Sequence, residues 1–277
     1  MYATSPSDLD HFLRRLPDEA AVLVRVLRTR GSVPRAAGTW MAVWLEGQIG
    51  TIGGGHLEWD ALARAREALA GGATQPWEQR VALGPSLGQC CGGELVLRYE
   101  PVVGAQCEAL AERLTEALSP VALFGGGHVG QAIVRALAPL PFSVRWIDSR
   151  DGVFPEMLPA SVQTEHSDPV DAAVRELAPG SRVLIMSFSH AEDLEVVAAC
   201  LARIRGQDDL PFVGLIGSRT KWATFRRRLA ERGATPAELD RITCPIGLPG
   251  ITGKEPAVIA ASVVAQLLLA TSAGAPG

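Results

Sequence analysis

Two adjacent cysteines, Cys90 and Cys91, are the side chains of this sequence best suited to unusual chemistry. They stand in Gly88-Gln89-Cys90-Cys91-Gly92-Gly93, where glycines leave the backbone exposed and the thiols with little cover. Such thiols can act as nucleophiles, redox groups or soft-metal ligands. A structural zinc site normally needs C-x₂-C pairs, and the sequence has none. The simpler alternative is a pair of small buried apolar residues, although a core position has no need of neighbouring glycines.

Two glycine-rich segments in the same half of the chain could supply an anion site. They are Gly31-Ser32-Val33-Pro34-Arg35 and residues 50–58, which include Gly53, Gly54 and Gly55. Exposed backbone N–H groups beside a cation such as Arg35 suit an anionic ligand. Each segment can instead be an ordinary turn, with a solvated arginine or a helix-opening glutamate. Because loops on a rigid scaffold often carry function, a ligand site shared with the two cysteines is the other hypothesis.

A G-x-G-x-x-G motif, Gly125 to Gly130, lies between a predicted strand and a predicted helix. Its glycines let the backbone approach a pyrophosphate at the start of the helix. Asp148, 18 residues beyond Gly130, ends the next predicted strand, where a carboxylate can bind ribose hydroxyls. Arg150 could accept a 2′-phosphate instead. These features predict a Rossmann-like fold, although a glycine turn used only for packing would give the same pattern.

Three more segments place polar residues just before or at the start of a predicted helix. Residues 187–193 contain His190, which is either a proton donor or a polar residue satisfied locally at the helix start. Gly217, Ser218 and Lys221 repeat this strand-to-helix arrangement and add a cation. Lys254 ends a Pro- and Gly-rich loop before the last helix, where a positive charge opposes the helix dipole. We therefore expect Lys254 to have a local anionic partner.

The pattern of predicted strands and helices changes near residue 119. The first half predicts strands at 20–29, 39–45, 48–52, 79–83 and 94–99, with helices from residue 7, at 56–70 and at 107–117. The second half alternates strands at 121–124, 143–147, 182–186 and 212–216 with helices at 128–137, 191–203 and 257–270. The segment after Asp148 carries little signal. We predict an α/β protein with an N-terminal mixed α/β domain (1–118) and a Rossmann-like domain with a mainly parallel sheet (119–277), joined at Ser119-Pro120.

Composition narrows the class of protein further. The chain has 277 residues, 26 Lys+Arg, 30 Asp+Glu and a formal net charge of -4, which disfavours nucleic acid as a partner. The longest apolar stretch, 257–270, is shorter than the roughly 18–20 residues of a membrane span, so we expect a buried helix. No signal peptide is evident, and five cysteines, two of them adjacent, do not resemble a disulfide framework. We therefore expect a cytoplasmic protein, and a homodimer by default.

Read together, the motifs resemble the xanthine dehydrogenase accessory family, also called the XdhC/CoxI family. The matching stretches are G-S-V-P-R at Gly31, G-T-I-G-G-G-H-L-E at Gly50, G-Q-C-C-G-G at Gly88, F-G-G-G-H-V-G at Phe124, S-H-A-E-D at Ser189, G-L-I-G-S-R-T-K at Gly214 and C-P-I-G-L-P-G-I-T-G-K at Cys244. They run in family order over nearly the whole chain. The combination is specific, whereas the Rossmann glycines alone would not be.

The resemblance implies a function that composition and spacing cannot show. Proteins similar to this one bind the molybdenum cofactor and, with a cysteine desulfurase, help to exchange an oxo ligand for the terminal sulfido ligand. They then deliver the cofactor to xanthine dehydrogenase or a related molybdenum hydroxylase. In this interpretation Cys90 and Cys91, with Gln89 beside them, are the contact to molybdenum or a sulfur relay. Arg35 and the turn from Gly53 to Gly55 would hold the pterin phosphate.

The second domain would bind NAD(P) or another adenine nucleotide. The residues assigned to cofactor binding there are Gly125, Gly127, His128, Gly130, Asp148, His190, Gly217, Ser218, Lys221 and Lys254. Two other functions fit the sequence. One is an NAD(P)-dependent oxidoreductase acting on a small carbonyl compound, with His190 as the proton donor. The other is a regulatory domain in which nucleotide binding changes the affinity for the molybdenum cofactor.

Overall fold

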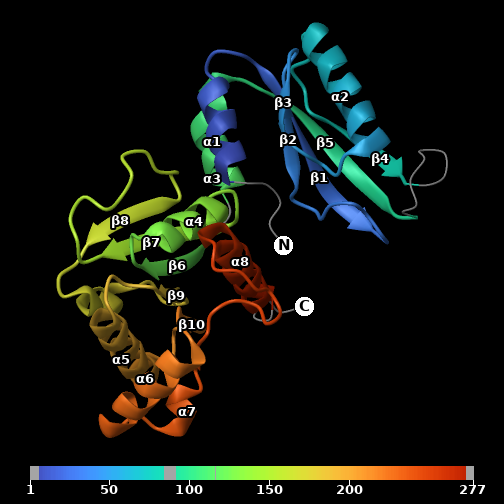
Figure 1. Ribbon diagram of the computed structural model, residues 1–277. Helices are drawn as coiled ribbons and strands as arrows, with labels where there is room; N and C mark the ends of the chain where they lie inside the picture. Colours follow the sequence, from blue (N-terminus) through green and yellow to red (C-terminus); the bar gives the residue numbers. More distant parts are fainter. Residues whose placement is uncertain (1–5, 84–91, 116, 273–277) are drawn as a thin grey trace. The chain divides into compact units, whose positions relative to one another are not determined.

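The computed structural model describes residues 6–83, 92–115 and 117–272, and the chain divides into two compact units. The first unit extends to Glu116 and the second begins at Ala117. In Figure 1 the first unit runs from blue to green and the second from green to red. Each unit has its own sheet and its own apolar core, so each is described by itself.

The first unit is built on a five-stranded antiparallel sheet with the order β3-β2-β1-β5-β4. Its strands are β1 (Ala21–Arg30), β2 (Trp40–Val43), β3 (Gln48–Gly50), β4 (Trp77–Ala82) and β5 (Glu94–Val102). Successive side chains of a strand point to opposite faces, so β5 alternates between buried and half-buried residues over much of its length. Apolar side chains therefore lie on both faces of the sheet, and each face must pack against other elements.

Helices supply that cover on both faces of the first sheet (Figure 1). Helix α2 (Gly55–Ala70) packs Leu57, Ala61 and Ala65 on the face that carries Val22 and Val24. Helices α1 (Pro6–Arg15) and α3 (Cys107–Leu114) pack on the other face, against Leu23 and Trp40 among others. A 3₁₀ turn, η2 (Gly104–Gln106), leads from β5 into α3. The result is a mixed α/β unit with two apolar layers.

The second unit contains a six-stranded parallel sheet with the order β11-β10-β9-β6-β7-β8. Its strands are β6 (Ser119–Phe124), β7 (Phe142–Asp148), β8 (Val162–His166), β9 (Arg182–Ile185), β10 (Phe212–Leu215) and β11 (Ile242–Thr243). Counted from β6, this is the strand order 3-2-1-4-5-6 of the Rossmann fold. The chain order reverses between β6 and β9, and ligands of such sheets bind beyond the carboxyl ends of the strands at that point.

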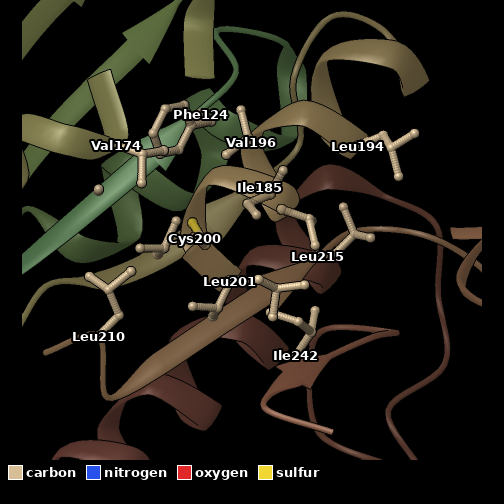
Figure 2. Packing of buried hydrophobic residues seen from close by; sticks show 14 of the residues in the cluster. Phe124, Val174, Ile185, Leu194, Val196, Cys200, Leu201, Leu210, Leu215 and Ile242 are labelled. Carbon is tan, nitrogen blue, oxygen red and sulfur yellow. The ribbon is translucent and has the colours of Figure 1, made fainter. Parts of the chain in front are cut away.

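Two helical layers enclose the parallel sheet. Helices α4 (His128–Leu137) and α8 (Pro256–Ser272) pack on one face. The other face is covered by η3 (Val170–Glu176), α5 (His190–Gln207), α6 (Arg219–Glu231) and α7 (Pro236–Leu239). Figure 2 shows the core of this second face, where Cys200 of α5 lies among apolar side chains of β6, β9 and β10. Strands buried on both faces explain the continuous apolar runs of the sequence.

The predicted α/β class and the Rossmann-like sheet are confirmed, but several local predictions need correction. Ser119 and Pro120 are the first residues of β6, not a linker, because proline is tolerated at the start of a strand. The weak segment after Asp148 forms β8 and η3. Four of the five residues of β8 are polar and only Val162 is buried, because β8 is an edge strand, so its apolar signal is faint. Helix α3 ends at Leu114, earlier than predicted.

The predicted buried helix is α8, and its burial is confined to one side. Ala260 and Val263 are buried in the core, whereas Leu269 is 61% exposed. Two polar residues that interrupt its apolar sequence hold the preceding loop: Ser262 accepts the backbone N–H of Leu248, and Gln266 accepts that of Gly247. Among the described residues, no helix has the length and apolar character required to cross a bilayer.

Candidate functional site

Glycines bring three motifs of the first unit together. A Cβ at Gly93 would overlap the carbonyl oxygen of Ser32, so the backbones of the two segments are in direct contact. A Cβ at Gly53 would lie 2.7 Å from Cβ of Pro34. The segment from Gly31 to Arg35 therefore contacts both the Gly53 turn and the end of the segment that begins at Gly88. The sequence alone left open whether these motifs share a site.

Glu58 fixes the turn that contains Gly53 and Gly54. Its Oε2 accepts the backbone N–H groups of Ile52 at 3.0 Å and Gly54 at 3.1 Å, and the Thr51 hydroxyl at 2.5 Å. Burial disfavours the charged form, but these bonds and one from Gln48 outweigh it and lower the pKa of Glu58. Sequence reasoning treated Glu58 only as a helix-opening charge. Its larger role is to shape the loop through backbone donors.

Of the site residues predicted in the first unit, the structure describes Arg35 and the glycines of the 53–55 turn. Arg35 is half-buried, and its Cγ lies 3.3 Å from the Cβ position of Gly53. Gly54 has open space where a Cβ would stand. Gly55 is exposed and begins α2. Gln89, Cys90 and Cys91 lie outside the described residues.

The glycine motif of the second unit forms a tight turn between β6 and α4. A Cβ at Gly125 would overlap the carbonyl oxygen of Met186, which follows β9 across the reversal point of the sheet. A Cβ at Gly130 would overlap the carbonyl oxygen of Gly125, so the helix packs closely on the turn. Gly127 has no atom within 4 Å of its Cβ position. Two of the glycines thus serve packing, while Gly127 leaves free space before the first residue of α4, His128.

Asp148 is buried, and its carboxylate accepts hydrogen bonds from Gly126 and Arg150. Its Oδ2 accepts the N–H of Gly126 at 2.6 Å, and Arg150 donates Nε to Oδ1 and Nη2 to Oδ2, both at 2.9 Å. Burial raises the pKa of Asp148, but these bonds outweigh it and hold the pKa below its usual value. The Arg150 guanidinium also lies 4.4 Å from the ring centre of Phe188, an exposed residue that the sequence did not single out.

Lys221 forms a nearly buried ion pair with Asp193. Its Nζ lies 2.5 Å from Asp193 Oδ2 and donates to the carbonyl of Ile216 at 2.9 Å, while Asp193 Oδ1 accepts the N–H of Ser187. The Lys221 stem fills the space beside Gly217, where a Cβ would meet it at 2.6 Å. The ammonium predicted to bind a cofactor thus links the carboxyl ends of β9 and β10.

The remaining predicted residues of the second unit stand at helix starts. Ser218 caps α6 by accepting the N–H of Lys221. His190 begins α5, with its ring edge-on to Phe225 at 6.5 Å. Lys254 is exposed and makes no ion pair with any described residue, so the anionic partner expected from the sequence is not supplied by this part of the chain.

The cysteines that the structure describes differ from the predicted reactive pair. Burial raises the pKa of Cys200 to about 12 and that of Cys244 to about 11, which keeps both as thiols at neutral pH. Cys107 is half-buried near the carbonyl of Leu13. Within residues 6–83, 92–115 and 117–272, no cluster of three or more His, Cys, Asp or Glu could hold a metal ion.

The sheet order and the turn at Gly125 define the second unit as a Rossmann domain behind a mixed α/β unit. A family model described as "XdhC Rossmann domain" matches residues 121–267, and one described as "XdhC and CoxI family" matches residues 15–81. The chain belongs to the XdhC/CoxI family.

Two similar proteins place this family assignment in context. YqeB of Escherichia coli (strain K12), described as uncharacterized, is 30% identical over 261 residues, which are 92% of this chain and 44% of YqeB. The chain therefore spans less than half the length of this relative. A Bacillus halodurans crystal structure, described as a xanthine dehydrogenase, matches with a TM-score of 0.75 at 20% identity over 97% of this chain and 96% of that chain. At that identity the match shows the fold.

Proposed function

We propose that this protein is an accessory protein that binds the molybdenum cofactor, assists its sulfuration with a cysteine desulfurase, and delivers it to xanthine dehydrogenase or a related molybdenum hydroxylase. Membership of the XdhC/CoxI family and the name given to the Bacillus halodurans structure support an accessory role. The observation that carries the proposal is the contact of Ser32 with Gly93 and of Pro34 with Gly53, which gathers three motifs of the first unit.

The described residues of the first unit fit an anionic ligand. Gly54 and Gly92 have no atom within 4 Å of their Cβ positions, so a ligand can approach the backbone there. Arg35 brings a positive charge to the same turn, and an arginine can bind a phosphate through two hydrogen bonds. Cys90 and Cys91 directly precede Gly92 in the chain. We assign them as the soft contacts to molybdenum.

Retention of the cofactor tests this proposal directly. The protein is incubated anaerobically with molybdenum cofactor, desalted, and analysed for molybdenum and pterin. Wild type should retain both near one equivalent, and the Cys90→Ala/Cys91→Ala double variant should lose most of the metal. Cys107→Ala, which removes a half-buried thiol from the same unit, is the matched control and should behave as wild type. If wild type and the double variant retain equal amounts of molybdenum, the two thiols do not bind the metal.

Sulfuration and delivery need a separate measurement. A partner hydroxylase is activated in the presence of a cysteine desulfurase and either wild type or the double variant. Activation should fall at least tenfold with the double variant if a thiol takes part. Light scattering of the purified protein tests the expected homodimer in the same samples, because a single-chain mass would exclude it.

We also propose that the second unit binds an adenine nucleotide at the turn from Gly125 to His128. The open space at Gly127 and the lack of a side-chain cap at the start of α4 support a phosphate there. Gly127→Ala adds one methyl group in a backbone conformation that alanine adopts freely, and it should abolish binding of NAD, NADP or AMP without unfolding the protein. Gly206→Ala, also in open space, is the control. Titration calorimetry gives both affinities.

The nucleotide could serve an oxidoreductase or a regulatory domain, and two experiments separate them. Turnover of NAD(P)H with a small carbonyl compound, lost in His190→Ala, would support the oxidoreductase. A change in molybdenum cofactor affinity upon nucleotide binding, with the equal reciprocal change, would support regulation. The strand order favours nucleotide binding in both cases, because it creates the reversal point between β6 and β9.

A further inference from the structure

We infer that the second unit has a separate pocket for a small organic anion, formed by the loop between β11 and α8. The cavity measures about 290 Å³, near the lower end of the roughly 300–1,000 Å³ typical of small-molecule sites. It lies beyond the carboxyl ends of β10 and β11, to one side of the reversal point between β6 and β9. The inference concerns the second unit only and does not depend on the molybdenum proposal.

The walls of the pocket are mainly apolar. Ile246, Leu248 and Ile251 line it from the loop, and Val258 and Ile259 line it from the first turns of α8. Ile251 is 48% exposed, so part of this wall faces solvent. An apolar or aromatic ring seated here would remove that surface from water, which favours binding.

Hydrogen bonds fix the loop before any ligand arrives. Gln266 accepts the N–H of Gly247 and Ser262 that of Leu248, both at 2.8 Å, and Ile246 donates to the carbonyl of Leu215 at 3.1 Å. Glycine is required at 247, because a Cβ there would lie 2.7 Å from the Ser262 hydroxyl. A wall held in this way loses little entropy on binding. This role also explains why an otherwise apolar helix carries Ser262 and Gln266.

Two cations at this pocket have no partner among the described residues. Arg219, the first residue of α6, lines it and has no ion pair or side-chain hydrogen bond within the described chain. Lys254, next to the lining residue Gly253, also has none there, whereas Arg203 and Arg205 of the same unit are paired. No lining residue is acidic, although the Glu255 carboxylate reaches 2.9 Å from the Cβ position of Gly253. The net charge of these three side chains at the pocket is therefore positive.

Apolar walls and an unpaired guanidinium together select the class of ligand. A phosphate or carboxylate would bind Arg219, and an attached ring or short hydrocarbon would contact Ile246, Ile251 and Ile259. Inorganic phosphate alone lacks the apolar part, and a neutral ring lacks the charge. The pocket should therefore prefer a ring that carries one anionic group over either part alone.

Methyl NMR of the full chain, with isoleucine δ1 methyl groups labelled, tests this pocket. Phenyl phosphate, benzoate and inorganic phosphate are titrated separately. We expect saturable shifts of Ile246, Ile251 and Ile259, with Ile133 and Ile147 of the same unit unchanged. Phenyl phosphate or benzoate should bind at least fivefold more tightly than inorganic phosphate, and the tighter of the two identifies the preferred anionic group. Unsaturated shifts, or shifts centred elsewhere, would overturn the inference.

Charge variants provide the second arm of the test. Arg219→Ala should weaken the better ligand about tenfold, as expected for one lost hydrogen bond to a charged group. Arg228→Ala, an exposed arginine of the same helix outside the pocket, should have no effect. Ile251→Asp should weaken binding because it adds a negative charge to the pocket wall, and Glu255→Gln should strengthen it because it removes one nearby. Both residues are exposed. Equal affinity in the Arg219 and Arg228 variants would exclude the proposed anion contact.

Discussion

Each unit of this protein uses one carboxylate to hold a glycine-rich turn in front of a helix, but the two carboxylates reach their turns differently. Glu58 lies in the helix that its turn precedes, and it accepts hydrogen bonds from residues at most ten positions away, namely Gln48, Thr51, Ile52 and Gly54. Asp148 lies at the end of the neighbouring strand, 22 residues from Gly126, and binds a guanidinium as well. The first arrangement is local, whereas the second requires the assembled sheet.

The difference shows what each turn can offer to a ligand. The donors to Glu58 are neutral, and Gly54 keeps open space on its outer side. The donors to Asp148 include Arg150, so the carboxylate that could bind a ribose is already neutralised. A nucleotide that uses Asp148 must displace or share Arg150, whereas a ligand of the first turn displaces no internal ion pair of Glu58.

The largest expected effect concerns the glycines pressed against another backbone. Gly93→Ala and Gly125→Ala should each lower the free energy of unfolding by about 3 kcal/mol or more, because the added methyl groups overlap carbonyl oxygens. Gly206→Ala and Gly127→Ala, where a Cβ meets nothing and φ is not positive, are controls that should change it by about 1 kcal/mol or less. Urea unfolding measures all four. Similar losses in variants and controls would contradict the close contacts.

A smaller effect is expected at the charged carboxylate of the second unit. Asp148→Asn should lower the free energy of unfolding by about 2 kcal/mol, because Arg150 and the N–H of Gly126 lose a charged acceptor. Arg150 is partly exposed and can turn to water, which limits the loss. Asp151→Asn, at a carboxylate that is 92% exposed, is the control. If the two variants lose the same stability, the ion pair of Asp148 and Arg150 contributes little.

Neutralising Glu58, the carboxylate of the first unit, should lower the free energy of unfolding by less than neutralising Asp148. Glu58→Gln should cost about 1 kcal/mol, because an amide oxygen can still accept from Ile52 and Gly54 and no cation is left behind. Glu67→Gln, farther along the same helix, is the matched control. Thermal unfolding compares the two variants. A loss larger than that of Asp148→Asn would reverse the proposed ranking of the two carboxylates.

The dependence of stability on pH sharpens the comparison further. Both folded pKa values lie below the unfolded ones of about 3.9 for Asp and 4.3 for Glu. Their contribution is therefore complete above about pH 5 and is lost as the pH falls through the lowered values. Between pH 6 and pH 3, stability should fall less in Asp148→Asn and Glu58→Gln than in wild type. If stability falls equally with pH in wild type and both variants, other groups cause the acid sensitivity.

Much of the second unit could be predicted from the sequence, because its central strands are buried on both faces and helices α5, α6 and α7 are capped by nearby residues. The glycine motif and the helix beginning at His128 both follow from local chemistry. The edge strand β8 was missed because three of its five residues are exposed. The roles of Phe188 and Asp193 depend on Arg150 and Lys221, which other elements supply. Exposure of a large aromatic residue cannot be recognised in a sequence.

The sequence by itself determined the family motifs, the α/β class and the local turns, since these depend on residues close along the chain. Only the tertiary structure decided that Gly93 meets Ser32, that Lys221 pairs with Asp193, and that Ser262 holds Leu248. Those contacts join residues 14 to 61 positions apart. Chain order carries no information about which distant groups become neighbours until the sheets and helices pack, because burial and hydrogen bonding across the core make that choice.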